Sequence, residues 1–250
     1  MIRRVILAAL VLLLGAAPAI AAGRYSVDRY DSRLDLLEDG ALRVTETITI
    51  QFETGSFSQF YRAIPRRLND GIEILSASMD GTSTPIGSGS GHLENSGSSN
   101  VRVTWRFAVT APASHTFEVT YVAHGTVRQE DDADVVAWNL LPSEHSYRIA
   151  TSTADITLPE SPSASPSIEV RRVGNSNVDV DGRHVRIDAN TIRANGWVQV
   201  WIRLPPGAAI KTPPLWQQRQ ADIRRLSTRW LYAAGILFMS GLASLFFVRQ

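Results

Sequence analysis

The amino-acid sequence predicts an all-β fold of tandem antiparallel β-sandwich domains, placed between two apolar segments. Apolar and polar residues alternate along residues 42–52, 101–109, 117–121 and 198–204. A period of two is typical of strands with one buried face, and antiparallel sheets of such strands pack in pairs as sandwiches. Asp-Gly pairs at 39–40, 80–81 and 181–182 supply residues that tolerate the positive φ of tight hairpins.

The N-terminal apolar segment has the pattern of a signal peptide over residues 1–21. Arg3 and Arg4 precede a short apolar run, and Ala19 and Ala21 provide the small residues of a cleavage site. The run is shorter than the ~20 apolar residues that span a bilayer. We expect cleavage after Ala21; the alternative is an uncleaved anchor.

Between the apolar ends, the pattern divides the body in two. We predict a first β-sandwich over residues 24–143 and a second, smaller one over residues 144–207, because residues 160–167 are rich in Ser and Pro and interrupt regular strand pairing. One continuous sandwich is the alternative. Residues 87–100 are rich in Gly and Ser and indicate a loop. Residues 208–229 form a predicted stalk, with prolines first and a helix after them.

The C-terminal apolar segment, residues 230–248, predicts one transmembrane helix, with the lipid bilayer as its partner. It contains no charged side chain, and at ~1.5 Å per residue it reaches ~28 Å, close to the ~30 Å hydrocarbon core. Trp230 and Tyr232 stand at the end where aromatic rings prefer the headgroup level. Ser240 and Ser244 are four residues apart, so a partner helix could pack there, although ordinary membrane composition is the plainer interpretation. A buried helix of a soluble protein is the other alternative for the whole segment.

These two segments place the chain at the cell membrane with its body on the extracytoplasmic side. One observation conflicts with that orientation, because Arg224, Arg225 and Arg229 precede the apolar segment and only Arg249 follows it. Basic residues normally collect on the cytoplasmic side. Either further membrane segments settle the topology, or these arginines bind lipid headgroups on the outer side.

The amino-acid composition argues against several kinds of site and partner. The chain has no Cys, which excludes disulfides and thiolate catalysis. Its 25 basic and 24 acidic residues nearly balance, so no nucleic-acid partner is expected. The five histidines are scattered, and the acidic cluster at residues 130–134 does not have the spacing of a calcium loop. We therefore expect no metal and no cofactor.

Glu46 is the one charged residue on the apolar face of the 42–52 strand. A buried lone carboxylate is costly, so Glu46 should be paired or neutral. Our hypothesis is a structural ion pair with Arg62, whose guanidinium could hold the carboxylate with two hydrogen bonds. A catalytic acid, or an edge position open to water, are the alternatives.

Two further sets of residues are candidates for an interaction surface. Trp197 and Trp201 lie four residues apart on the polar side of the last strand and could stack on sugar rings or on a partner protein. Arg66 and Arg67 flank a turn after Pro65 and could meet acidic lipid or an envelope polymer. Packing inside the protein, for the tryptophans, and solvation, for the arginines, are the plainer interpretations.

Several short motifs together resemble a known family. They are Glu38-Asp39-Gly40, Leu42-Arg43-Val44-Thr45-Glu46, Phe60-Tyr61-Arg62-Ala63-Ile64-Pro65, Tyr121 and Gly125, Trp138-Asn139, Leu158-Pro159 and Leu204-Pro205-Pro206-Gly207. With them the chain resembles, over residues 25–245, the predicted bacterial membrane proteins catalogued as domain of unknown function (DUF) 2207. The resemblance implies a signal peptide, an extracytoplasmic β region and membrane attachment, and it implies no reaction.

We therefore expect a membrane-anchored extracytoplasmic protein that serves as a binding or assembly module at the cell envelope, with another membrane protein or an envelope polymer as a possible partner. The alternative is an envelope hydrolase that uses a carboxylate pair, with Glu46 or with Asp131 and Asp132 as candidates. A pair of carboxylates facing each other in a deep pocket would favour the hydrolase.

Overall fold

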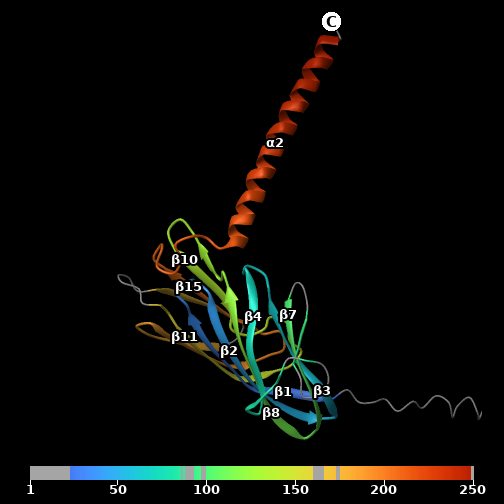
Figure 1. Ribbon diagram of the computed structural model, residues 1–250, viewed down its shortest axis with the longest axis vertical. Coiled ribbons are helices and arrows are strands. Elements are labelled where there is room, and N and C mark those ends of the chain that lie inside the picture. Colours follow the sequence, from blue (N-terminus) through green and yellow to red (C-terminus); the bar gives the residue numbers. More distant parts are fainter. Residues whose placement is uncertain are drawn as a thin grey trace, which may run out of the picture.

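A computed structural model describes residues 23–85, 87, 93–96, 100–159, 166–172 and 175–248 (Figure 1). The body is built from β-strands, so the predicted all-β class is confirmed. One large sheet forms one layer, and two smaller sheets pack on its apolar side. The predicted signal peptide, residues 1–21, lies outside the described residues.

The large sheet has eight strands in the order β13-β14-β11-β1-β2-β8-β4-β5. Their bounds are β1 (Arg24–Leu36), β2 (Leu42–Thr54), β4 (Gly71–Met79), β5 (Thr82–Ser83), β8 (Ala113–His124), β11 (Ile149–Thr157), β13 (Asn175–Asp181) and β14 (His184–Ile192).

The opposite layer consists of a four-stranded sheet, β12-β15-β10-β9, and a three-stranded sheet, β3-β7-β6. Their bounds are β3 (Ser56–Pro65), β6 (Leu93–Ser96), β7 (Asn100–Thr110), β9 (Val127–Gln129), β10 (Asp134–Asn139), β12 (Ser167–Arg172) and β15 (Val198–Leu204).

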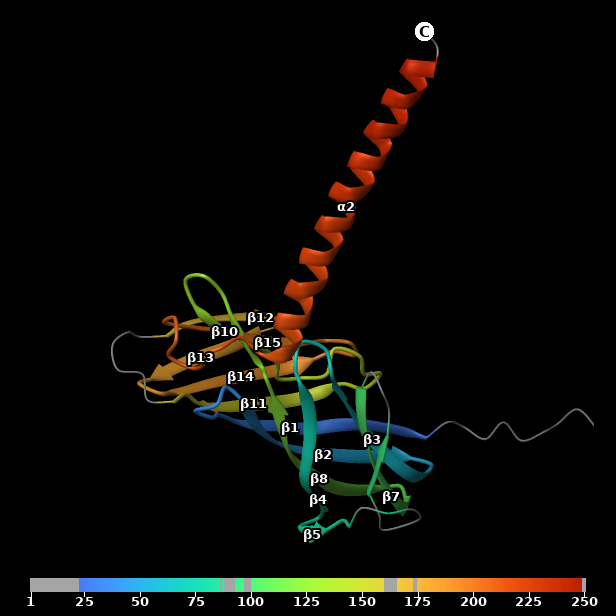
Figure 2. The ribbon, with the colours of Figure 1, turned by 45° about the horizontal axis from the view of Figure 1, so that its top comes forward.

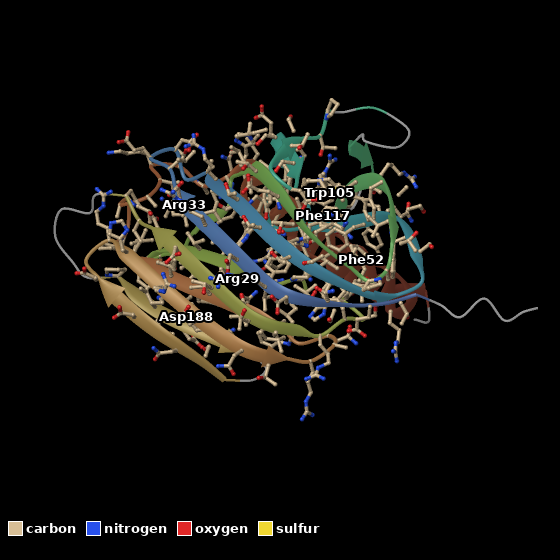
Figure 3. All side chains as sticks on the ribbon, turned by 90° about the horizontal axis from the view of Figure 1, so that it is seen from below. Arg29, Arg33, Phe52, Trp105, Phe117 and Asp188 are labelled. Carbon is tan, nitrogen blue, oxygen red and sulfur yellow. The ribbon has the colours of Figure 1, made fainter. Side chains whose placement is uncertain are left out.

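The alternating pattern of the sequence is reproduced in the burial of the strands. On β2, Ile48 and Ile50 are fully buried, whereas Thr45 and Thr49 lie on the outer face. There the hydroxyl groups of Thr45 and Thr120 are 3.0 Å apart, a cross-strand pair that stabilises the outer face. On the inner side, Phe52, Trp105 and Phe117 gather at one end of the core, opposite the end where Arg33 is labelled (Figure 3).

The predicted hairpin chemistry is also present. Asp80 and Gly81 join β4 to β5 with φ of 52° and 76°, and Met79 pairs with Thr82 on either side of them. Two positive φ values in a two-residue loop match the twist of the flanking strands. The Asp-Gly pair therefore defines this turn.

The strand order corrects two predictions: the body is not divided into tandem sandwiches, and its strands are not all antiparallel. β11, from the predicted second unit, pairs in parallel with β1 of the first, from Val27 opposite Ile149 to Asp35 opposite Thr157. Strands on both sides of residue 143 thus share one sheet and one apolar core, as in the continuous sandwich. The physical reason is that a period of two reports a buried face, but it does not report which strand lies alongside or in which direction it runs.

Helix α2 (Leu215–Val248) is a single 34-residue helix that leads away from the body (Figures 1 and 2). It covers the predicted span 230–248 in backbone, but the side chains of Ser240, Ser244 and most of that span lie outside the described residues. Among the residues that are described, no helix combines the length and the apolar character needed to cross a membrane. The predicted stalk is helical only from Leu215 onward.

Candidate functional site

The structure brings Glu46 and Arg62 together from opposite layers of the sandwich. Glu46 lies on β2 of the large sheet, and Arg62 lies on β3 of the three-stranded sheet. The Arg62 Nε donates to Glu46 Oε2 at 2.6 Å, and Nη2 donates to Oε1 at 3.0 Å. Only 1% of the Glu46 side chain and 4% of the Arg62 side chain are exposed. The pair is therefore a two-point tie between layers, out of contact with water.

Two tyrosines complete this cluster. The Tyr30 hydroxyl on β1 donates to Glu46 Oε2 at 2.5 Å, and the Tyr121 hydroxyl on β8 donates to Oε1 at 2.7 Å. Both phenols are fully buried. Tyr30 was not among the predicted site residues. Its place on the inner face of β1, diagonal to Glu46 across the β1–β2 register, is the signal that could have identified it.

The electrostatics of the cluster favour a charged Glu46 and neutral phenols. Burial acts to raise the pKa of Glu46, but the Arg62 charge and the hydrogen bonds that the carboxylate accepts outweigh it, so the pKa lies below its usual value. Burial raises the pKa of Tyr30 and of Tyr121 well above the usual value of 10.0. A carboxylate held ionised by four donors has no proton to give, so the arrangement acts as a structural tie.

The acidic cluster at residues 130–134 is divided among separate partners. Glu130 and Asp132 both bind Arg203, at 2.9 and 3.0 Å. Asp134 is fully buried on β10, and its Oδ2 accepts the backbone N–H groups of residues 209 and 210 at 2.9 and 3.1 Å. Asp131 is exposed. Among the described residues, no set of three His, Cys, Asp or Glu side chains could hold a metal ion.

The two predicted surface tryptophans have different surroundings. Trp201 lies on β15, and the guanidinium groups of Arg171 and Arg128 lie over its ring at 4.2 and 5.5 Å from the centroid. Its Nε1 donates to Gln199 Oε1 at 2.6 Å. Trp197 comes just before β15 and is half-buried. Because arginines already stack on Trp201, its ring is not a bare platform for a sugar.

A second constellation, where helix α2 joins the body, was not predicted. Asp70, in the turn after β3, accepts the Leu215 N–H at Oδ2 and the Trp216 N–H at Oδ1, both at 2.8 Å. These are two of the unpaired donors at a helix N-terminus, so Asp70 caps α2 from a distant part of the chain. Arg219, one turn along, reaches the same carboxylate at 3.4 Å.

Other contacts fix the same joint. The Trp216 Nε1 donates to the Gly125 carbonyl at 2.8 Å. The Gln217 side-chain amide bonds the backbone of Gln129 twice: its Nε2 donates to the carbonyl at 2.6 Å, and its Oε1 accepts the N–H at 3.0 Å. Gly125 has φ of 62°, and a Cβ there would lie 2.4 Å from the Asp70 carboxylate. We call Asp70, Gly125, Gln129, Trp216 and Gln217 the helix mount. It gives α2 one direction relative to the sheets.

Fold and joint together define an all-β body that carries a long, firmly mounted C-terminal helix. The chain belongs to the family described as predicted membrane protein (DUF2207), N-terminal domain, whose model matches residues 26–204. No curated protein matches the chain.

Among solved structures, the chain is similar to an M1 zinc metallopeptidase from Deinococcus radiodurans, at 13% identity and a TM-score of 0.44, covering 74% of this chain and 43% of that one. It is also similar to native yeast LTA4 hydrolase, at 11% identity and a TM-score of 0.47, covering 75% of this chain and 31% of that one. A third similar structure is a putative protease from Parabacteroides distasonis, at 10% identity and a TM-score of 0.46, covering 72% of this chain and 40% of that one. The chain spans less than half the length of each.

Proposed function

We propose that this protein is a membrane-anchored binding or assembly module whose β-sandwich works on the extracytoplasmic side of the cell envelope. In this proposal residues 1–21 direct export, residues 230–248 cross the bilayer, and the polar part of α2 holds the body above the surface. The membership in a family of predicted membrane proteins supports the membrane association.

The helix mount is the observation that carries the proposal. A flexible linker would be enough to keep a domain near a membrane. Here, instead, Asp70 caps the helix, and Trp216 and Gln217 bond to Gly125 and Gln129. A fixed helix direction holds the body at one height and one angle, which is useful to a protein that must present a particular face to a partner.

The hydrolase alternative finds less support in the same geometry. It requires two carboxylates that face each other across accessible space. Glu46 is enclosed by Arg62 and two phenols. Of the other two candidates, Asp132 binds Arg203, whereas Asp131 is exposed to solvent.

Sidedness can be tested because the chain contains no cysteine. Single cysteines are placed at Arg33→Cys, on the exposed outer face of β1, and at Gln250→Cys, beyond the apolar segment. With a membrane-impermeant maleimide on intact cells, Arg33→Cys should be labelled and Gln250→Cys should react only after permeabilisation. Labelling in the reverse order would disprove the proposed orientation.

Assembly is tested by chemical crosslinking in native membranes. The full chain is compared with Asp70→Ala, which releases the cap, and with Asp222→Ala, a matched change on the exposed face of α2. We expect specific crosslinked products that decrease for Asp70→Ala and persist for Asp222→Ala. The same products in undiminished amount from a chain lacking residues 208–250 would show that the mount has no part in assembly.

A further inference from the structure

The turn between β3 and β4 presents a basic and apolar tip to solvent. Arg66 and Arg67 are exposed, and no described residue forms an ion pair with either. Leu68 is 43% exposed, one of few large apolar side chains left open to water among the described residues of the body. Arginine is enriched at protein interfaces, so two exposed arginines beside an exposed leucine make this tip a candidate contact surface.

This turn is held in a costly conformation. Leu68 has φ of 60°, in the left-handed region that residues other than glycine seldom occupy. The buried side chain of Asn69 holds it, donating to the Pro65 carbonyl at 2.9 Å and accepting the Gly71 N–H at 3.2 Å. Such strain persists where the surroundings enforce it, and it is concentrated at functional positions.

A stacked pair lies beside the turn on the outer face of the three-stranded sheet. The Arg102 guanidinium lies 3.8 Å from the centre of the Tyr61 ring, and Tyr61 is 47% exposed. Arg102 pairs with Ala63 in the β3–β7 register. From Tyr61 to Pro65, where the turn begins, the strand extends ~13 Å. The stacked pair therefore lies on the half of β3 that leads into the turn, where Arg66, Arg67 and Leu68 follow.

We propose that this surface, made of Tyr61, Arg66, Arg67, Leu68 and Arg102, binds an anionic sugar polymer of the cell envelope. Guanidinium groups recognise carboxylate and phosphate with paired hydrogen bonds. Tyr61 and Leu68 offer apolar contacts to the C–H faces of sugar rings, which a purely charged polymer would leave unused. The inference rests on the proposed function and names the ligand class of the binding module.

The position of the turn separates this ligand from lipid headgroups. Asp70 ends the turn and caps α2 at Leu215. At ~1.5 Å per residue, Trp230 lies ~22 Å further along the helix. If the bilayer begins near Trp230, the turn stands well beyond the ~8 Å screening length of physiological salt. The field of the lipid surface does not reach it, whereas a polymer that fills the space above the membrane does.

The test uses the full chain in nanodiscs of neutral lipid and measures binding of three probes. Polygalacturonate supplies charged sugars, inorganic polyphosphate supplies charge alone, and dextran supplies neutral sugar. The variants are the pair Arg66→Gln with Arg67→Gln, and the single change Tyr61→Ala. The matched control is Arg43→Gln with Arg148→Gln, which removes two exposed arginines elsewhere on the body.

We expect polygalacturonate to bind most tightly, with an affinity that falls as salt is raised. The double variant Arg66→Gln with Arg67→Gln should bind polygalacturonate about tenfold or more weakly, because each lost contact is a charge-assisted hydrogen bond. Tyr61→Ala should weaken the binding of polygalacturonate but not the binding of polyphosphate. The control pair should bind within about twofold of the natural chain.

The proposal would be overturned if the Arg66/Arg67 double variant and the Arg43/Arg148 control lost the same affinity for polygalacturonate. It would also be overturned if dextran bound as tightly as polygalacturonate, or if polyphosphate were the tighter ligand. An unchanged melting temperature in each variant establishes that the fold is intact. If no probe binds while the crosslinked products in native membranes persist, the sugar ligand is disproved and the assembly function stands.

Discussion

Arg62 reaches across the sandwich to Glu46 and holds both oxygens of its carboxylate, at 2.6 and 3.0 Å. The large sheet and the three-stranded sheet are thereby joined by a charged contact inside an otherwise apolar core. Taking two charges out of water is expensive, so the contact is most informative when one partner is removed.

Glu46→Gln should lower the free energy of unfolding by about 3–5 kcal/mol, because it leaves the Arg62 charge buried without a counter-charge. Denaturant titration of the full chain in detergent measures this loss. Glu118→Gln, on the outer face where Glu118 accepts from Thr47, is the matched control and should cost less than about 1 kcal/mol. Equal effects of the two changes would contradict the tie.

A double-mutant cycle measures the coupling within the pair. Changing Glu46→Met and Arg62→Met together removes both charges, so the double variant should lose less stability than the sum of the two single losses. Strict additivity would mean that the pair is not coupled in the folded protein.

Stability should fall at both ends of the pH range. The pKa of folded Glu46 is lowered, so its contribution is complete above the unfolded value and is lost as pH falls through the folded pKa. The pKa values of folded Tyr30 and Tyr121 are raised well above 10.0, so their contribution is complete below that value and is lost as pH rises through the folded pKa. Both signs follow from linkage.

Tyrosinate absorbance checks the alkaline arm. Tyr30 and Tyr121 should ionise only together with unfolding, which circular dichroism records in the same titration. Their ionisation with the far-ultraviolet signal still native would place both phenols in contact with water. In the acid arm, Glu46→Gln should flatten the dependence of the unfolding free energy on pH.

Asp70→Ala should loosen the base of α2 without unfolding the body. An N-cap residue contributes about 1 kcal/mol, so amide exchange in the first turn after Leu215 should accelerate about fivefold, as that energy implies. Exchange in β2 should stay unchanged. An identical acceleration in Asp222→Ala would mean that the effect is not specific to the cap.

Gly125→Ala tests the packing of the same joint. Its new Cβ meets the Asp70 carboxylate at 2.4 Å, whereas Gly182, with a similar φ of 59°, has open space around the corresponding position. Gly182→Ala therefore carries only the backbone cost of about 1–2 kcal/mol, and Gly125→Ala should cost more and release α2. Equal melting temperatures of the two variants would remove the steric argument.

The sequence supports some of these features and not others, for physical reasons. The strand pattern, the Asp80-Gly81 turn and the proximity of Glu46 to Arg62 follow from local periodicity, turn chemistry and the cost of a lone buried charge. The cap by Asp70 does not, because 145 residues separate it from Leu215. The parallel pairing of β1 with β11 was missed likewise, since partner and direction depend on contacts that no short pattern encodes.

The distance along the chain between β1 and β11 also determines how the protein must be made. Val27 finds Ile149 only after the intervening chain has emerged, roughly ten seconds later at ordinary rates of synthesis. Until then one edge of β1 stays open and can pair with any other extended chain. A chaperone that covers the first strand would prevent such mispairing while the remainder of the chain arrives.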